Sequence, residues 1–289
     1  MKGKLPAATH IQFAHLRVAD VNRICTFYAG ELGLRVVGER ENRAALSATG
    51  RPPFLLQLTE DRHAPPRPPN VPGLFHIAIR FANRGMLASA VLKLLRRGYP
   101  LQGAADHAVS EAIYLADPEG NGVELYADRL RTLWRPRGGG VVMVTEYLDL
   151  NGLLAEAERV DASEVDMGID IGHVHLSVSD LAKAQQFYAA TLGFDVTTRS
   201  YPGALFLAAG GYHHHIGLNT WYSRGRSKNH TDSLGLIAFG IAVPESGWSD
   251  VRERIVASSV TILEQSPSSL LLQDNDGIGV ELRRVPDSP

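Results

Sequence analysis

The chain of 289 residues contains a single cysteine, Cys25, and this scarcity excludes two kinds of structure. One cysteine cannot form an intrachain disulfide, and it cannot supply a cysteine-rich zinc site. The N-terminal segment MKGKLPAATH lacks the apolar core of a secretory signal, and no apolar run approaches the ~18 residues of a membrane span. We therefore expect a soluble protein of the reducing cytoplasm.

An excess of charge of either sign is also missing. The chain has 29 Lys and Arg residues against 31 Asp and Glu residues, so its formal net charge is −2. A charge balance this close to neutral gives no reason to expect nucleic acid or an anionic membrane as a partner. Hydrophobic residues make up 44% of the chain, enough for a substantial core. The expected partners are small molecules, and a homo-oligomer is possible.

What the chain does contain is one unit repeated four times. The segment FAHLRVADVNRICTFYAGELGL at 13–34 matches HVHLSVSDLAKAQQFYAATLGF at 173–194, and the segment endings GNGVELY and GIGVELR match in two further copies. Each copy starts with an alternating strand and continues into a helical stripe, for which Ser179 is the expected N-cap in the third copy. Short apolar strands follow. The repeat predicts four β-α-β-β-β modules of roughly fifty to sixty residues each.

These modules, numbered 1 to 4 along the chain, predict an α+β fold. We expect modules 1 and 2 to form a first domain over residues 9–128, and modules 3 and 4 to form a second over residues 169–286. Residues 129–168 are the expected connector, which contains three consecutive glycines and an acidic segment of low hydrophobicity near 155–167. Paired modules of this kind pack their helices on one sheet face and leave the other face free for a site.

Strand alternation places candidate metal ligands on that free face. His76 and His173 take the same position in the first strands of modules 2 and 3, whereas modules 1 and 4 have Phe13 and Ala238 there. A lone histidine in a strand is most often structural. Two histidines at repeat-equivalent positions favour a shared role.

The last strands of modules 2 and 4 add a carboxylate, Glu124 in one and Glu281 in the other. Because module 4 has no histidine at the equivalent position, Glu281 is expected to be structural or salt-bridged. Glu124 with His76 and His173 makes a set of two imidazoles and one carboxylate. Such a set suits non-haem Fe(II) with open coordination positions, or Mn(II).

These residues, with the segments HVHLSVSD, GGYHHHIGLNTW and DHAVSEAIYLADPEGNGVELYADR, resemble the vicinal oxygen chelate superfamily. Within it they are most similar to the two-domain catechol 2,3-dioxygenases, which cleave an aromatic ring beside two hydroxyls. The resemblance implies modules paired into two open-barrel domains and a metal held by His76, Glu124 and His173. It also implies Fe(II) as the cofactor, with Mn(II) possible, and a small aromatic diol and O2 as substrates.

The resemblance further assigns roles around the metal. Tyr114, just before the Asp-Pro turn, and His107 upstream of it would hydrogen-bond the substrate oxygens. Strand alternation in GGYHHHIGL would place His213 and His215 on the cavity side and turn His214 toward the helices. His215 would then be the catalytic acid/base, and His213 would contact substrate at the cavity edge.

One feature departs from the familiar extradiol layout, in which many members keep all metal ligands in the C-terminal pair of modules. Here the candidate ligands fall in modules 2 and 3. We therefore predict that module 2 pairs with module 3 around the metal and that module 1 pairs with module 4. The rival arrangement pairs the modules sequentially and takes its ligands from His15, His76 and Glu124.

Two other kinds of function remain open at this point. The first is another metal-dependent enzyme of the superfamily, such as a glyoxalase-like isomerase or a thiol transferase, although these usually have a fourth protein ligand. The second is a non-catalytic protein that binds a small molecule without metal. Bound iron in anaerobically purified protein separates the second from the enzymes.

Overall fold

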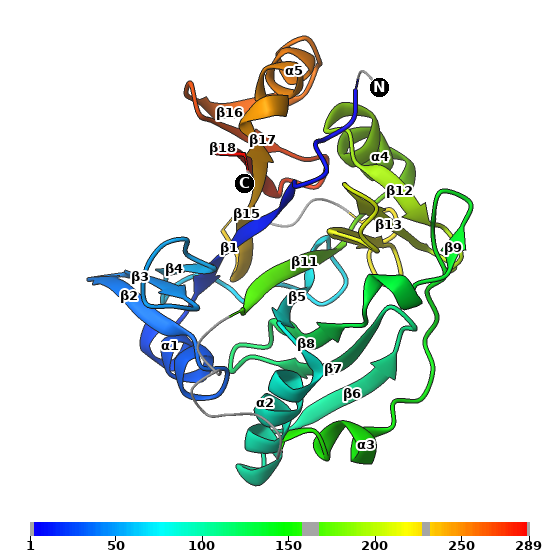
Figure 1. Ribbon diagram of the computed structural model, residues 1–289. Helices are drawn as coiled ribbons and strands as arrows, with labels where there is room; N and C mark the ends of the chain where they lie inside the picture. Colours follow the sequence, from blue (N-terminus) through cyan, green and yellow to red (C-terminus); the bar gives the residue numbers. More distant parts are fainter. Residues whose placement is uncertain (1–2, 158–167, 227–231, 288–289) are drawn as a thin grey trace. The chain divides into compact units, whose positions relative to one another are not determined.

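The computed structural model describes residues 3–157, 168–226 and 232–287 (Figure 1). It is an α+β protein in which most strands of the described residues belong to two eight-stranded sheets, with few helices. Neither sheet closes on itself in the described strand order. The predicted fold class is therefore confirmed. No helix in the described ranges combines the length and apolar character needed to cross a membrane.

Each of the four repeats follows the predicted order of elements. Module 1 comprises β1 (His10–Val18), α1 (Val21–Gly30), β2 (Arg35–Arg40), β3 (Arg43–Ser47) and β4 (Leu56–Glu60). Module 2 comprises β5 (Gly73–Phe81), α2 (Arg84–Arg96), β6 (Leu101–Asp106), β7 (Ser110–Ala116) and β8 (Gly122–Asp128). The connector contributes η1 (Arg131–Leu133), β9 (Pro136–Arg137), β10 (Gly140–Val141) and α3 (Leu150–Leu154).

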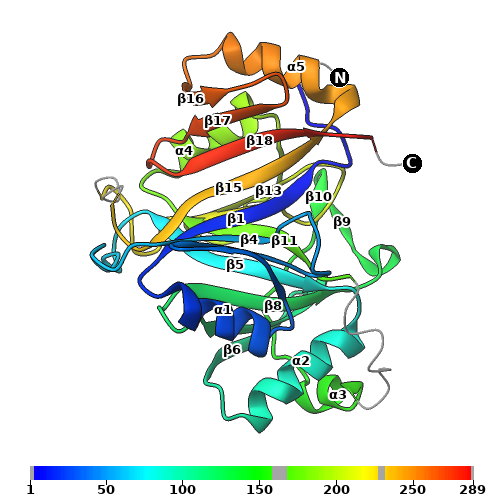
Figure 2. The ribbon, with the colours of Figure 1, turned by 90° about the vertical axis from the view of Figure 1, so that its left-hand side faces the viewer.

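The second half of the chain repeats this arrangement. Module 3 comprises β11 (Asp170–Ser177), α4 (Leu181–Gln185), its π-helical continuation η4 (Gln186–Thr191), β12 (Asp195–Thr198), β13 (Ala204–Ala208) and β14 (Ile216–Asn219). Module 4 comprises β15 (Gly235–Pro244), α5 (Glu245–Val256), β16 (Thr261–Gln265), β17 (Ser269–Gln273) and β18 (Gly279–Val285). In module 4, α5 covers one face of the strands beside it (Figure 2).

The helices of modules 1 to 3 begin at short polar side chains, as capping chemistry requires. Asp20 accepts a hydrogen bond from the backbone N–H three residues ahead, and Asn83 does the same for α2. In module 3 the capping residue is Asp180, which accepts from two backbone N–H groups. The predicted cap, Ser179, is therefore wrong by one position, because the carboxylate of Asp180 reaches the first turn.

The order of hydrogen-bonded strands shows which modules share a sheet. One sheet runs β16-β17-β18-β15-β1-β4-β3-β2, and the other runs β12-β13-β14-β11-β5-β8-β7-β6. Within the first sheet, β1 and β15 are antiparallel, with Phe13 opposite Gly240. Modules 1 and 4 thus share one sheet and modules 2 and 3 share the other. The predicted sharing of sheets is confirmed, and the placement of modules 2 and 3 around a metal stays a prediction.

By residue contacts the chain divides into two compact units. Unit 1 contains residues up to 17, residues 64–75 and residues from 173 on, whereas unit 2 contains residues 18–63 and 76–172. Unit 1 therefore holds most of modules 3 and 4, and unit 2 holds most of modules 1 and 2 with the connector. The domain boundaries expected from the sequence, 9–128 and 169–286, stay a prediction.

Inside unit 1, the helix of module 3 is fixed to a turn of module 4. The hydroxyl of Tyr188 donates to the carboxylate of Asp274 at 2.8 Å, and the backbone N–H of Ser179 donates to Asp276 at 2.9 Å. Burial raises the pKa of Asp274 to about 6 and raises the pKa of Tyr188 further above its ordinary value. Asp274 is therefore a carboxyl group that is costly to ionise.

Inside unit 2, modules 1 and 2 repeat this contact. The hydroxyl of Tyr28 lies 3.5 Å from Asp117 in the turn before β8, and the backbone N–H of Ala19 donates to Glu119 at 2.8 Å. Burial raises the pKa of Asp117 as well. The sheets thus join modules 1 with 4 and 2 with 3, while these tyrosine–turn contacts join modules 1 with 2 and 3 with 4.

Candidate active site

The first half of the candidate site is a buried histidine–carboxylate pair in unit 2. His76 lies in β5 and Glu124 in β8, which are parallel neighbours with Ala78 beside Glu124. Nε2 of His76 lies 2.9 Å from Oε2 of Glu124, and the two residues are 6% and 3% exposed. A carboxylate this deeply buried is costly unless a polar partner compensates for the lost water. The imidazole of His76 provides that partner.

Tyr114 and His107 lie next to this pair in the same unit. Tyr114 stands in β7 directly opposite Glu124, and its ring centroid is 5.8 Å from that of His76. Its hydroxyl lies 2.7 Å from Nε2 of His107, which occupies the turn between β6 and β7. Unit 2 therefore brings together four of the residues that the sequence nominated.

His173, the third predicted ligand, lies in β11 within unit 1 and is 1% exposed. The ring centroid of His214 is 4.0 Å from that of His173, and the centroid of His213 is 6.2 Å from it. Nδ1 of His213 and Nδ1 of His214 are 2.8 Å apart. Two members of the histidine run therefore gather beside His173.

The ring of His215 has different neighbours. Its Nδ1 accepts a hydrogen bond from the backbone N–H of Ala209, and its ring packs against Tyr212 and against Phe194, the residue before β12. These ring contacts differ from the expected alternation, in which His215 faces the cavity and His214 turns toward the helices, while the roles of both residues stay predictions. The ring of His214, which was expected on the helix side, packs against His173.

The reason is that strand alternation does not hold through His213 and His214, whereas the backbone of His215 already bonds to Leu207 and Val174 in the neighbouring strands. Strand β14 begins only at Ile216, so the histidines lie in the turn before it. Gly210 and Gly211 both adopt left-handed backbone angles, with φ of 62° and 68°. Two consecutive glycines in a sequence indicate such a turn. This signal could have shown that strand alternation does not assign the directions of the histidines that follow.

A further buried histidine was missed. His175 follows in β11, and its Nε2 lies 3.1 Å from the side-chain amide of Asn219. Its ring centroid is 4.9 Å from that of Phe75, and a Cβ on Gly217 would overlap the ring. Only glycine at 217 leaves room for this imidazole. Its place on the same strand face as His173 was the available signal.

The equivalent positions in the first strands of modules 1 and 4, and in the last strand of module 4, lie in unit 1 and are occupied by Phe13, Ala238 and Glu281. The guanidinium of Arg283 lies 4.6 Å from the ring centroid of Phe13, and its Nε donates to Glu281 at 2.6 Å. Glu281 is therefore salt-bridged, as predicted. His15, the ligand of the rival arrangement, pairs opposite Ala238 in this sheet, whereas His76 and Glu124 belong to the other.

The sequence of the chain is similar to that of known proteins. The family model described as the Glyoxalase/Bleomycin resistance protein/Dioxygenase superfamily matches residues 8–125 and 170–282. The chain belongs to this superfamily. It is 40% identical over 270 residues to the catechol-2,3-dioxygenase of Bacillus subtilis (strain 168), covering 92% of this chain and 94% of that protein. This homology supports a dioxygenase of the superfamily.

Solved structures of other proteins share the fold. A putative dioxygenase from Bacillus subtilis subsp. subtilis str. 168 matches with a TM-score of 0.66 at 12% identity, over 99% of this chain and 87% of that one. Glyoxalase I from Zea mays matches with a TM-score of 0.58 at 17% identity, over 96% and 92% of the two chains. At these identities the structures speak for the fold alone.

Proposed function

We propose that this superfamily member is a metal-dependent extradiol dioxygenase that opens the ring of a catechol, or of a substituted catechol, with O2. The observation that carries the proposal is the buried pair of His76 and Glu124, with Tyr114 beside it. The homology to a catechol-2,3-dioxygenase over almost the whole chain supports the same chemistry.

The donor set fits an iron centre. Among the described residues, one group of three His, Cys, Asp or Glu side chains could hold a metal ion, and it consists of His76, Glu124 and His173. Each offers one ligand atom and all three are buried. Two imidazoles and one carboxylate are typical of non-haem Fe(II), and Mn(II) accepts them too. Bound there, such an ion would hold a catecholate and O2 in one coordination sphere and favour ionisation of the catechol.

The chain's own residues supply orientation and proton transfer. Tyr114 would hydrogen-bond a substrate oxygen, and His107, whose Nε2 lies 2.7 Å from the Tyr114 hydroxyl beside Glu124, would act through that hydroxyl and not on the substrate itself. We assign the acid/base role to His214 in place of His215, because His214 packs against His173 and His215 packs against Phe194. His213 would contact substrate, as expected from the sequence.

The test is anaerobic loading of the purified protein with Fe(II), followed by addition of catechol and air. We expect O2 uptake matched by a yellow ring-opened product. No uptake across a panel of substituted catechols would contradict the proposal. A Glu124→Gln protein provides the matched negative control, because the substitution keeps the size of the side chain and removes its charge.

Two alternatives make different predictions in the same experiment. A glyoxalase-like isomerase or thiol transferase would bind the metal and consume no O2, and the three-residue donor set counts against its usual four protein ligands. A non-catalytic small-molecule binding protein would retain no iron after anaerobic purification. Iron content and O2 uptake together therefore separate all three functions.

A further inference from the structure

The connector between modules 2 and 3 contacts the ring of His107 through a main-chain carbonyl. Nδ1 of His107 lies 2.6 Å from the carbonyl oxygen of Val144, which is 37 residues further along the chain. A carbonyl oxygen only accepts hydrogen bonds, so Nδ1 carries a proton. In a neutral imidazole this leaves Nε2 as an acceptor, and Nε2 is 2.7 Å from the hydroxyl of Tyr114. The hydroxyl proton of Tyr114 is therefore directed at His107.

The two backbone segments that carry His107 and Val144 are joined by hydrogen bonds between Asp106 and Glu146. The N–H of Asp106 donates to the carbonyl of Glu146 at 3.0 Å, and the N–H of Glu146 donates back at 2.9 Å. Ala108, next in the turn, adopts a left-handed φ of 64°, which costs free energy for any residue with a Cβ. Its N–H donates to the side chain of Asp106 at 2.8 Å, so Asp106 closes the turn that carries His107.

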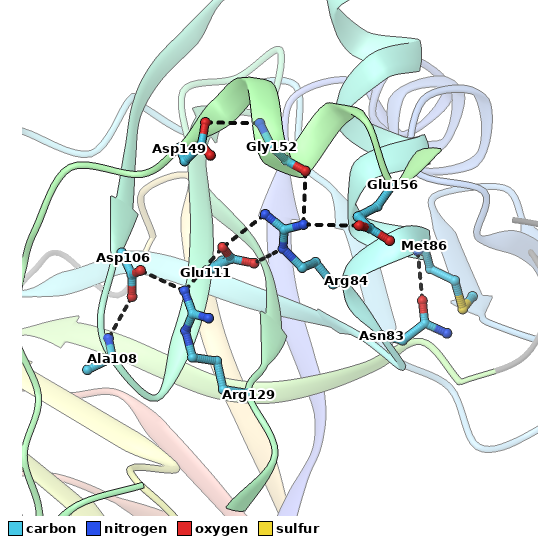
Figure 3. Close-up of polar contacts among 10 residues, drawn as sticks. All are labelled: Asn83, Arg84, Met86, Asp106, Ala108, Glu111, Arg129, Asp149, Gly152 and Glu156. Carbon is cyan, nitrogen blue, oxygen red and sulfur yellow. Dashed lines mark hydrogen bonds and ion pairs between the residues drawn. The ribbon is translucent and has the colours of Figure 1, made fainter. Parts of the chain in front are cut away.

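A series of ion pairs and hydrogen bonds links this turn to helix α3 of the connector, as Figure 3 shows. Arg129 donates from Nη2 to Asp106 at 2.6 Å and to Glu111 at 3.2 Å. Glu111, only 5% exposed, accepts from Nε of Arg84 at 2.6 Å, and Arg84 donates to the carbonyl of Gly152 in α3 at 2.9 Å. Charged hydrogen bonds of this geometry are stronger than neutral ones.

We propose that Arg129 and Glu111 are positioning residues, which hold the connector against the β6–β7 turn so that the Val144 carbonyl fixes His107 as the Nδ1–H tautomer. The consequence of this tautomer for catalysis rests on the proposed function, whereas the tautomer itself does not. With its proton given to His107, the hydroxyl of Tyr114 presents only lone pairs to a substrate. Tyr114 then accepts a hydrogen bond from a substrate hydroxyl and discriminates against a methyl ether at that position.

The first test reads the tautomer directly in the full-length protein without added iron. Long-range ¹H–¹⁵N correlation spectra of histidine-labelled protein distinguish the two neutral tautomers, and the signals lost in His107→Asn identify His107. We expect Nδ1–H in the wild type and in Tyr114→Phe, because the carbonyl sets the tautomer. An Nε2–H tautomer in either protein overturns the proposal.

The second test removes the ion pairs that Arg129 forms with Asp106 and Glu111. In Arg129→Gln we expect His107 to lose its single tautomer and, in the iron-loaded enzyme, kcat for catechol to fall about tenfold with a smaller change in KM. Arg129→Lys should restore part of both effects. The control is Arg97→Gln, which breaks an exposed 2.7 Å ion pair with Glu31 at the end of α2 and should change neither.

A double-substitution experiment separates positioning from a general structural effect. Since Arg129 acts through the His107–Tyr114 pair, Arg129→Gln should cost much less in kcat when Tyr114 is already phenylalanine. An equal loss in both backgrounds, or an unchanged tautomer in Arg129→Gln, overturns the proposal. If the wild type consumes no O2, the proposed function fails, and the tautomer spectra still decide this inference.

Discussion

Modules 2 and 4 present the same backbone positions with different side chains. In module 2, Glu124 stands opposite Tyr114 in the antiparallel neighbour and beside Ala78 in the parallel one. In module 4 the corresponding register places Glu281 opposite Leu271. Both modules therefore keep a carboxylate at the same point of the sheet. The register of the repeat has been retained while the residues around the carboxylate differ.

The difference lies in what neutralises each carboxylate. Glu124 contacts the imidazole of His76, whereas the position equivalent to His76 in module 4 is Ala238 and Glu281 binds Arg283 instead. The face of module 4 is hollowed by a cavity of about 190 Å³ lined in part by Ala238 and by apolar side chains. An imidazole can share a metal with a carboxylate and an arginine cannot, so the same fold carries a candidate centre in one module and a salt bridge in the other.

Neutralising each of the two carboxylates in turn tests this difference between modules 2 and 4. We expect Glu124→Gln to lose bound iron and at least about 100-fold in O2 uptake with catechol. Glu281→Gln should keep both the bound iron and the O2 uptake, since Glu281 forms its ion pair with Arg283. Iron content by elemental analysis and O2 uptake check the pair, and equal losses in the two variants would refute the distinction.

The histidine run offers a second comparison, between neighbouring residues. Because the ring of His214 packs against His173, His214→Gln should lower kcat about 100-fold with iron retained. His215→Gln keeps an acceptor for the N–H of Ala209 and should stay within about threefold of the wild type. Steady-state kinetics at saturating catechol measure both. A larger loss for His215→Gln would return the acid/base role to that residue.

The buried turn carboxyl groups of the tyrosine–turn contacts should make the stability of the protein depend on pH. Because burial raises the folded-state pKa of Asp274 to about 6 from 3.8, the folded state binds this proton more tightly than the unfolded state. Its contribution to stability is therefore full below about pH 4 and is lost as pH rises to about 6, a change of about 3 kcal/mol.

The substitution Asp274→Asn removes that titration. The free energy of unfolding, measured in urea from pH 4 to pH 7, should fall with pH in the wild type relative to the variant. Asp117→Asn, the module 2 counterpart, should show the same sign, because burial also raises the pKa of Asp117. A difference between wild type and Asp274→Asn that is constant with pH would contradict the account.

Substitution of Gly172, in β11, tests how tightly unit 2 is packed. A Cβ on Gly172 would overlap the hydroxyl of Tyr126, a fully buried residue. We expect Gly172→Ala to lower the free energy of unfolding by about 2 kcal/mol, and by much less in a Tyr126→Leu background. Gly38→Ala, in β2 with nothing near the added methyl, is the control and should be close to neutral.

The smallest effect is expected at the salt bridge of module 4. Arg283 is partly exposed and packs over Phe13, so Arg283→Gln should cost about 0.5 kcal/mol of stability and leave iron content unchanged. Urea unfolding and elemental analysis check this. Loss of iron in Arg283→Gln would mean that module 4 takes part in the centre after all.

The repeat made much of the fold predictable from the sequence. Alternating apolar residues and the matched copies were enough for the β-α-β-β-β order, whereas the sharing of sheets by modules 1 and 4 and by modules 2 and 3 was inferred from the modules that contain the candidate ligands. The pairing of His76 with Glu124 followed from equivalent strand positions. Such inferences succeed because strands have a fixed period and because every copy repeats the same register.

Two features lay beyond that reasoning. The orientation of His214 depends on a turn at Gly210 and Gly211, where the strand period does not hold. The tautomer of His107 depends on a main-chain carbonyl of Val144, and a carbonyl leaves no mark in the residue pattern. Side-chain periodicity reports on regular strands, and both features are set by irregular backbone.

The most direct measurement is the iron content of two histidine variants purified anaerobically under identical conditions. If modules 2 and 3 supply the ligands, His15→Ala should retain the iron content of the wild type, and His173→Ala should lose it. Iron retained by His173→Ala, or lost by His15→Ala, would contradict the assignment of the centre to His76, Glu124 and His173.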